Sequence, residues 1–497
     1  MTRPLAARLA ALGPWRSALA LTALVAVAHL LVAARTPLTA DEAHYALYGL
    51  YLDWSYFDHP PLVGWLQALV LPWSQAEFAL RLWPIALSFA TAPVLFHFAR
   101  RLFPEGHPWL GFWSAALFLT GPLFQAIGLA LVPETPLLLL ALLALLNLLN
   151  ALDRGRRRDW LLFGLCLGLA GLAKYTAVTL ALSALAFVVT QRRLEVLRTA
   201  GPWLAVLVAG LLIAPVLYWN VTHDWLSFRY QLGHGFRPKD WEWSRVALSQ
   251  IGQFIAYGPA LFIAGLVALV AGFREWRVRG VQLVLLTALP VLLLFAFGSG
   301  REETLPHWTA LAWLVSAPLA VRWLMTYWTQ RSVRALAWGS SLYSVALILL
   351  AHILLLWPSL PGTPSRAVQG AIQGWPEAAA RARALRDEMR DPAAALFVPN
   401  WSLASRLAWY ARPLPVQVTD TRVDQFDLWF GSPAPGASGV LVMPGFALKR
   451  NASVLRRFEN CNEQAPLPIV AGGQAVVTFH FYLCRGYHAP DIAPPFS

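Results

Sequence analysis

The sequence predicts an α-helical polytopic membrane protein, with about 11 transmembrane helices and a small α/β domain at its C-terminal end outside the cytoplasm. Three observations predict this class. Hydrophobic residues make up 58% of the 497 residues and charged residues only 13%. The mean hydropathy of +0.52 lies above that of soluble globular domains. Long apolar runs alternate with arginine-rich breaks, and a less apolar tail follows the last run.

The apolar runs approach the length of about 20 residues that a bilayer core requires. The first run continues into Arg35 and is interpreted as a retained helix, not a cleaved signal peptide. Two runs, on either side of Lys174, are short for full spans, so we expect a tilted or partly embedded hairpin with Lys174 at its tip. The predicted helices lie near 15–34, 78–99, 109–128, 135–152, 160–173, 175–190, 202–219, 247–272, 281–298, 307–323 and 335–357.

Arginines gather in every second loop, as expected of cytoplasmic loops under the positive-inside rule. These loops contain Arg100 and Arg101, Arg154 to Arg158, Arg192 to Arg198, Arg274 to Arg279, and Arg331 with Arg334. With the N-terminus in the cytoplasm, an odd number of helices places the tail outside. We therefore expect a membrane domain over 1–357, which includes a large first extracytoplasmic loop over 35–77, and an extracytoplasmic domain over 358–497. The net charge of +13 then reflects membrane topology and not nucleic-acid binding.

The tail mixes helical and strand-like patterns. A helix is predicted over 376–390, and strands over 395–398, 416–418, 439–442 and 476–481. The aromatic stretch 424–429 is interpreted as a core strand, with an exposed surface segment as the alternative. In an extracytoplasmic tail Cys461 and Cys484 can form a disulfide, and two unpaired thiols are the alternative.

Asp41 and Glu42 follow the first helix, within Thr39-Ala40-Asp41-Glu42-Ala43-His44-Tyr45. A carboxylate at this membrane edge can act as a general base or a metal ligand. It can equally cap the N-terminus of a helix and interact favourably with the helix dipole. The two interpretations are compatible.

The same loop continues with Tyr56 and then with Asp58-His59-Pro60-Pro61. The prolines restrict the backbone, and fixed polar groups suit the binding of an anionic head group. The alternative is an ordinary turn.

Glu134 and Lys174 lie on the same predicted membrane face as the first loop. Glu134 stands between two prolines at the start of a helix, where an acidic residue also favours the helix dipole. Lys174 is one of only three lysines, beside Tyr175, and can neutralise a phosphate. A lysine that snorkels to the membrane interface is the alternative.

Two further polar clusters occur on this face. One follows Trp219 to Trp225 and includes Arg229; the other, Arg301 to Trp308, includes His307. The charged and histidine groups can complete a metal or phosphate site. Some of the residues in these clusters belong to an ordinary aromatic belt at the membrane interface. The sequence shows no Walker loop or dinucleotide fingerprint, so no nucleotide cofactor is expected.

Together these motifs resemble the bacterial polytopic glycosyltransferases related to protein O-mannosyltransferases and to the lipid A aminoarabinose transferase, including the Rgt-like enzymes. The resemblance covers about residues 15–325 and implies the GT-C fold. It rests on the order of Asp41 to Tyr45, Tyr56 to Pro61, Glu134 to Pro136, Lys174 to Thr176 and Trp219 to Trp225.

The resemblance implies a sugar donor linked to a polyprenyl phosphate and transfer with inversion. The expected catalytic residues are Asp41, Glu42 and Glu134. Asp41 matches the catalytic aspartate of the family, Glu42 and Tyr45 match its neighbours, and Glu134 matches a later acidic position near the acceptor or a metal. That position is more often Asp. A divalent metal, held by Asp41 and Glu134, is the candidate cofactor. The expected substrate-binding residues are Tyr45, Tyr56, Asp58, His59, Lys174, Tyr175, Arg229 and His307.

His59 stands where the aminoarabinose enzyme has lysine, so the substrate of that enzyme is not carried over. The function predicted is an inverting glycosyltransferase on the periplasmic face of the bacterial inner membrane. Its partners would be a polyprenyl-phosphate sugar, a lipid, glycan or protein acceptor and membrane lipids, but no nucleic acid. The alternatives are a lipid-linked sugar flippase or transporter, which predicts charges along a path inside the helices, and a catalytically silent scaffold.

Overall fold

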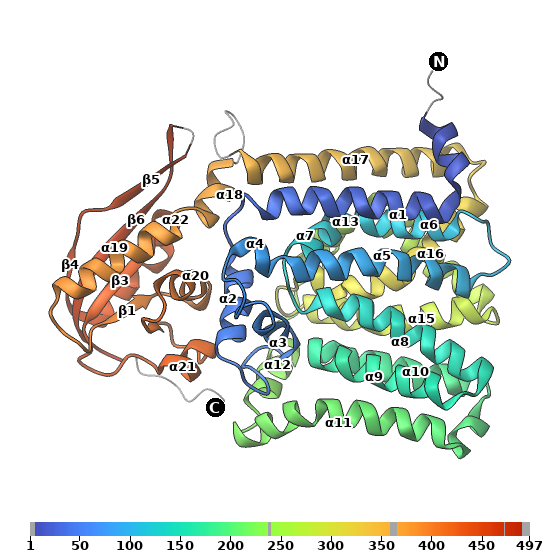
Figure 1. Cartoon of the computed structure of the whole chain (residues 1–497), viewed down its shortest axis with the longest axis horizontal. Helices are drawn as coiled ribbons and strands as arrows, with labels where there is room; N and C mark the ends of the chain where they lie inside the picture. The colour runs from blue at the N-terminus through green and yellow to red at the C-terminus, as the bar shows by residue number, and fades with distance from the viewer. Residues whose placement is uncertain (1–4, 237–239, 358–364, 472, 490–497) are drawn as a thin grey trace. The chain divides into compact units, whose positions relative to one another are not determined.

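The computed structural model describes residues 5–236, 240–357, 365–471 and 473–489 (Figure 1). The chain divides into two compact units. The helical unit comprises Met1–Leu31, His59–Val63 and Arg81–Leu349, and the sheet unit comprises Val32–Asp58, Gly64–Leu80 and Leu350–Ser497. Most of the first loop, 35–77, thus belongs to the unit that contains the tail. The contiguous domains expected over 1–357 and 358–497 stay a prediction.

Long apolar helices build the helical unit, and α1, α5, α8 and α11 run in one general direction in Figure 1. Helix α9 packs against both α8 and α11, and α5 packs against α6 and α8. The elements are α1 (Leu5–Ala33), α5 (Leu82–Leu102), α6 (Leu110–Leu119), α7 (Pro122–Leu129), α8 (Glu134–Arg154), α9 (Arg157–Ala173), η1 (Tyr175–Ala177), α10 (Val178–Thr190), η2 (Leu194–Arg198), α11 (Ala200–Thr222), α12 (Leu226–Phe236), α13 (Trp243–Tyr257), η3 (Ala260–Ala264), α14 (Gly265–Gly272), η4 (Phe273–Glu275), α15 (Arg279–Ser299), η5 (Pro306–Thr309), α16 (Ala310–Thr326) and α17 (Arg331–Leu356), the last of which continues into the sheet unit.

Every predicted apolar run is helical, but the expected number of about 11 membrane helices is not confirmed. Within the described ranges, seven helices are long and apolar enough to cross a membrane, or nine if each of two bent pairs is one span. The bends are 69° between α6 and α7 and 115° between α13 and the segment Ala260–Glu275. Helix α9, with 17 residues, and α10, with 13, are shorter than the other spans, and Lys174 lies at the break between them, as predicted.

The arginine-rich loops of the helical unit meet at one end of its helices. The Asp153 carboxylate, in the last turn of α8, forms ion pairs with Arg101 from the end of α5 and Arg279 from the start of α15. Glu134 begins the same α8, which has 21 residues. At 1.5 Å per residue the two ends of α8 are about 30 Å apart. Glu134 therefore lies at the end of α8 opposite the arginines.

The sheet unit is built on a six-stranded sheet in the order β2-β1-β3-β6-β4, with β5 also paired to β6. Strand β1 pairs in parallel with β2 and β3, whereas β6 pairs antiparallel with β3, β4 and β5. The strands are β1 (Ala395–Val398), β2 (Val416–Val418), β3 (Gly439–Pro444), β4 (Phe458–Glu463), β5 (Leu467–Ala471) and β6 (Gln474–Tyr487). The helices are α2 (Ala40–Leu50), α3 (Leu62–Ala68), which begins in the helical unit, α4 (Glu77–Leu80), α18 (Ser365–Ile372), α19 (Trp375–Glu388), α20 (Trp401–Ala411), α21 (Gln425–Phe430), α22 (Gly445–Asn451) and η6 (Ala452–Arg457).

The hydrophobic core of the sheet unit joins the first loop to the tail. Leu38, Ala43 and Leu47 are fully buried in one cluster with Trp375 and Phe479. Helix α2 packs against α20, and α19 packs against β1, β3 and β6. The segment predicted as a loop is therefore part of a folded core.

The tail confirms the predicted helix and the four predicted strands, and it adds β4 and β5. Strand β4 is mostly exposed and polar, so it lacks the alternation of apolar residues that identifies a strand. The core strand expected over 424–429 is wrong. Asp424 accepts a hydrogen bond from the Phe426 amide and begins helix α21 instead. The predicted disulfide is confirmed, because Cys461 and Cys484 face each other on β4 and β6 and are bonded.

Candidate active site

Glu134 and Lys174 form a buried ion pair in the helical unit. Glu134 lies in the first turn of α8, and Lys174 is the C-cap of α9. Lys174 Nζ donates a hydrogen bond to Oε1 of Glu134. Lys174 is only 7% exposed and Glu134 only 2%. Because a lone buried charge is strongly unfavourable, each residue makes the burial of the other possible.

Two histidines complete this cluster. Nε2 of His307, in η5, lies 3.7 Å from Oε1 of Glu134. His59 interacts electrostatically with the same carboxylate. The structure thus brings together four of the predicted site residues, with one carboxylate among three basic side chains. The Lys174 ammonium and the two imidazole rings can all donate hydrogen bonds, which suits a phosphate.

A polar network that the sequence did not reveal holds the turn that carries His307. The Tyr257 hydroxyl donates to the carbonyl oxygen of Pro306, the residue before His307, at 2.7 Å. Thr309 Oγ1 and Trp313 Nε1 both donate to Oε1 of Gln253, at 3.0 and 2.9 Å. The one signal in the sequence was a glutamine inside an apolar run, because a buried amide requires partners.

Tyr175 contacts the two residues that precede Arg229 on α12. The Tyr175 hydroxyl is 2.6 Å from Oγ of Ser227, and its ring centroid is 5.2 Å from that of Phe228. Arg229 follows on α12. These contacts connect α12 to the turn that begins at Lys174.

In the sheet unit, α2 begins with a capping box formed by Thr39 and Glu42. Oε2 of Glu42 accepts hydrogen bonds from the Thr39 amide at 2.9 Å and from its hydroxyl at 3.0 Å. The Glu42 amide donates in return to Thr39 Oγ1 at 3.4 Å. Glu42 is buried, whereas Asp41 beside it is exposed. The capping alternative therefore holds for Glu42, and Asp41 is the carboxylate that faces outward.

Asp58 accepts a hydrogen bond from the Tyr48 hydroxyl. Nε2 of His44 lies 3.8 Å from the same Asp58 oxygen, and its Nδ1 is 3.1 Å from Oγ of Ser405. Burial raises the pKa of Tyr48 well above its ordinary value, and the negative charge of Asp58 adds to this. Tyr48 therefore stays a proton donor. The spacing of four residues in the sequence indicates that Tyr48 and His44 share one face of the helix. The contact with Ser405 could not be predicted from the sequence.

Tyr45 and Tyr56 pack around Tyr48. The centroid of Tyr45 lies 5.4 Å from that of Tyr48, and Tyr56 stacks on Tyr48 at 3.6 Å. The Tyr56 hydroxyl donates to the carbonyl oxygens of Tyr48, at 2.8 Å, and Tyr51, at 3.1 Å. Burial raises the pKa of Tyr56. Tyr56 thus ties the loop to the end of α2, while substrate binding by either tyrosine stays a prediction.

Arg406, on α20, is a further charged group of the sheet unit. It is buried, its guanidinium lies 4.6 Å from the Trp375 ring centroid, and it donates to the carbonyl oxygen of Ala371. Burial lowers the pKa of Arg406 to about 10, against the opposing charge of Asp41. Nothing in the sequence pointed to this partner of Asp41.

The described residues do not fit the divalent metal predicted at Asp41 and Glu134. Across 5–236, 240–357, 365–471 and 473–489, no group of three or more His, Cys, Asp or Glu side chains can hold one ion. Oε1 of Glu134 moreover already accepts the Lys174 ammonium. Metal dependence stays a prediction.

Comparisons with known proteins agree with this architecture. The family model of dolichyl-phosphate-mannose-protein mannosyltransferases matches residues 58–219. The lipid A galacturonosyltransferase RgtD of Rhizobium johnstonii is 26% identical over 301 residues, which are 58% of this chain and 61% of that protein. The chain thus matches less than two thirds of the length of that relative.

Solved structures share the fold over most of the chain. ArnT from Cupriavidus metallidurans, solved with undecaprenyl phosphate, has a TM-score of 0.62 at 14% identity over 93% of this chain and 97% of that one. The oligosaccharyltransferase of Archaeoglobus fulgidus, solved with zinc and sulfate, has a TM-score of 0.50 at 12% identity over 95% and 74%.

The helical unit with its several candidate spans and the small C-terminal sheet define an integral membrane protein with the GT-C fold. The chain is similar to the lipid A galacturonosyltransferase RgtD in sequence and to ArnT in fold, and its residues 58–219 match the mannosyltransferase family model.

Proposed function

We propose that the protein is an inverting glycosyltransferase that moves a sugar from a polyprenyl-phosphate donor to lipid A or another envelope glycan or protein. The observation that carries the proposal is the sequence match to RgtD, a lipid A galacturonosyltransferase. The fold shared with ArnT, solved with undecaprenyl phosphate, supports a polyprenyl phosphate as the lipid carrier.

The leaving group of this reaction is a lipid phosphate. When the bond between the anomeric carbon and the phosphate oxygen breaks, its electron pair stays on the phosphate, which gains negative charge. Lys174, His307 and His59 surround Glu134 and are basic groups suited to stabilise that charge. In this proposal Glu134 holds Lys174 and His307 in position and does not act as a base.

The attacking group is a hydroxyl of the acceptor, which is a poor nucleophile until a base takes its proton. Asp41 is proposed as that base because it is the exposed carboxylate of α2, while Glu42 is engaged in the cap. The hydroxyl oxygen bonds to the anomeric carbon on the face opposite the phosphate, so the configuration is inverted. The proton passes to Asp41.

The distribution of arginines supports the periplasmic face of the bacterial inner membrane. Asp153, Arg101 and Arg279 lie at one end of α8 and Glu134 at the other. Under the positive-inside rule the arginine end is cytoplasmic, so Glu134 and Lys174 face the periplasm.

The experiment uses membranes that contain the full-length wild-type protein or Asp41→Asn, supplied with polyprenyl-phosphate sugars from a bacterial extract. Lipid mass spectrometry follows each donor. Loss of one donor species with the wild type, and its retention with Asp41→Asn, supports the proposal and identifies the sugar. Asp387→Asn, an exposed carboxylate on α19, is the control and should behave as the wild type. If no donor is consumed, or if Asp41→Asn consumes it equally well, the mechanism is wrong.

A further inference from the structure

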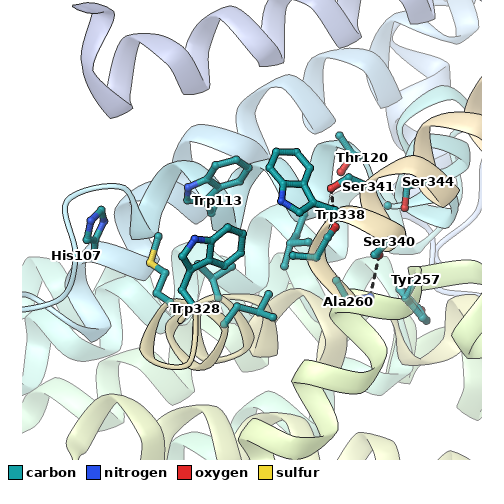
Figure 2. A pocket seen from close by; sticks show the side chains of 16 residues that line it. His107, Trp113, Thr120, Tyr257, Ala260, Trp328, Trp338, Ser340, Ser341 and Ser344 are labelled. Carbon is teal, nitrogen blue, oxygen red and sulfur yellow. Dashed lines mark hydrogen bonds between the residues drawn. The ribbon is translucent and has the colours of Figure 1, made fainter. Parts of the chain in front are cut away.

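A cavity of about 420 Å³ lies in the helical unit between α6, the α13–η3 bend, α16 and α17. Figure 2 shows His107 at one end, tryptophans in the middle, and Tyr257 with the serines of α17 at the other end. None of its lining residues belongs to the cluster around Glu134. The cavity is thus separate from the proposed transferase site.

The walls of the cavity are partly exposed at the surface of the helical unit. Trp113, Trp328 and Trp338 line it and are 49%, 42% and 67% exposed. Trp338 lies on α17, a candidate membrane span in which Leu342 is 72% exposed. Tryptophan favours the level of the lipid head groups. The cavity is therefore accessible from the lipid phase.

Two arginines outside the lining donate to backbone carbonyl oxygens of residues that line the cavity, Arg100 to His107 and Arg334 to Trp328. Nη1 of Arg100 donates to the carbonyl oxygens of Gly106 at 3.0 Å and His107 at 3.2 Å. Nη1 of Arg334 donates to the carbonyl oxygen of Trp328 at 3.2 Å. A guanidinium has five N–H donors, so further donors remain on each. In the described part of the chain, neither arginine forms an ion pair with a carboxylate. These two arginines therefore favour an anionic head group.

The volume favours a single fatty acyl chain. At about 30 Å³ for each water-sized group, a cavity of about 420 Å³ holds about 14 such groups. That is close to one fatty acyl chain. Two serine hydroxyls at the far end form hydrogen bonds with backbone groups, so an apolar chain can lie beside them. Ser341 donates to the Ala337 carbonyl oxygen at 2.9 Å, and Ser340 accepts from the Ala260 amide at 2.8 Å.

We propose that this cavity binds one acyl chain of an anionic glycerophospholipid, whose phosphate lies against Arg100 and Arg334. The chain end then packs beside Tyr257, the residue that holds the turn of His307. The bound lipid thereby supports the 115° bend between α13 and the segment that follows. Lipid binding at this site does not depend on the proposed transferase activity.

The test is native mass spectrometry of the full-length protein exchanged into detergent with phosphatidylglycerol, phosphatidylcholine or a polyprenyl phosphate. One phosphatidylglycerol should remain bound, with a preference over phosphatidylcholine of about tenfold or more, because the two arginines attract its net negative charge. Ser341→Trp places an indole in the cavity and should abolish retention. Leu342→Trp, on the same helix but outside the lining, is its matched control.

Arg100→Gln and Arg334→Gln should each reduce the preference for phosphatidylglycerol, whereas Arg158→Gln, an exposed arginine at the start of α9, should not. If Ser341→Trp fails to fold, Ala337→Leu serves as the second cavity-filling variant. Equal retention in Ser341→Trp and Leu342→Trp would overturn the proposal. So would retention of the polyprenyl phosphate alone, or of phosphatidylcholine as strongly as phosphatidylglycerol.

Discussion

Lys174 and Glu134, 40 residues apart in the chain, meet in a buried ion pair between the C-cap of α9 and the first turn of α8. The pair determines how the cluster with His307 responds to substitution. Removal of one partner leaves a charge in a buried site, whereas removal of both leaves none.

Lys174→Met should therefore destabilise the protein by about 3–5 kcal/mol, because the Glu134 carboxylate loses its ammonium partner. Glu134→Gln combined with Lys174→Met should recover most of this loss. The midpoint of thermal unfolding of the full-length protein measures both effects. Lys449→Met, at an exposed position of α22, is the control and should leave the midpoint unchanged. Equal loss in the single and double variants would show that the pair does not couple the two residues.

Asp41→Asn and Glu42→Gln should separate catalysis from capping. Asp41→Asn should reduce the transfer rate by about 10²-fold or more, the range for loss of a general base, with no loss of stability. Glu42→Gln keeps the capping box and should retain most activity. Thr39→Ala should cost about 0.5–2 kcal/mol of stability through loss of the cap. Donor consumption and thermal unfolding are measured on the same preparations. Full activity in Asp41→Asn would assign the base elsewhere.

Asp424 should make the stability of the sheet unit depend on pH. Burial raises the pKa of Asp424 to about 7, and the nearby charge of Asp427 adds to this. The folded state thus holds the proton more tightly than the unfolded chain. The stabilisation is fully present below the unfolded pKa of about 3.9 and is lost as pH rises through about 7.

The midpoint of thermal unfolding of the wild type should accordingly decrease as pH rises from about 4 to about 7, because the unfolded chain releases the Asp424 proton near its ordinary pKa of about 3.9 and the folded protein only near about 7. Asp424→Asn keeps a side chain that can cap α21 and should flatten this dependence. Asp387→Asn, with an exposed carboxylate, should leave the slope as in the wild type. An unchanged slope in Asp424→Asn would assign the dependence to other groups.

The disulfide between Cys461 and Cys484 should leave Cys166 as the single reactive thiol. Alkylation of the denatured protein without reductant should therefore modify Cys166 alone, and after reduction all three cysteines. Reduction should also cost about 3 kcal/mol, the typical value for a loop of this length. Mass spectrometry counts the thiols, and Cys166→Ala should show none without reductant. Three reactive thiols in the untreated protein would exclude the bond.

Local pattern was sufficient for most of the helices and strands. The apolar runs predicted the positions of all the long helices, because a helix of that length and composition needs no particular partner to form in a membrane. The count of about 11 is not confirmed at α9 and α10, since the pattern does not distinguish a full span from a shorter apolar helix. Residues 424–429 failed for a different reason: the Asp424 cap outweighed the aromatic, strand-like composition.

The sequence by itself determined the membrane class, the arginine-rich loops and the candidates Asp41, Glu134, Lys174 and His307, because charge and hydropathy are local properties of the chain. The tertiary structure alone decided which of them meet. Glu134 meets Lys174 and His307 because the start of α8, the end of α9 and η5 lie together, and Glu42 turns inward to its cap while Asp41 stays exposed. Such contacts depend on how distant segments pack, and spacing along the chain does not encode that packing.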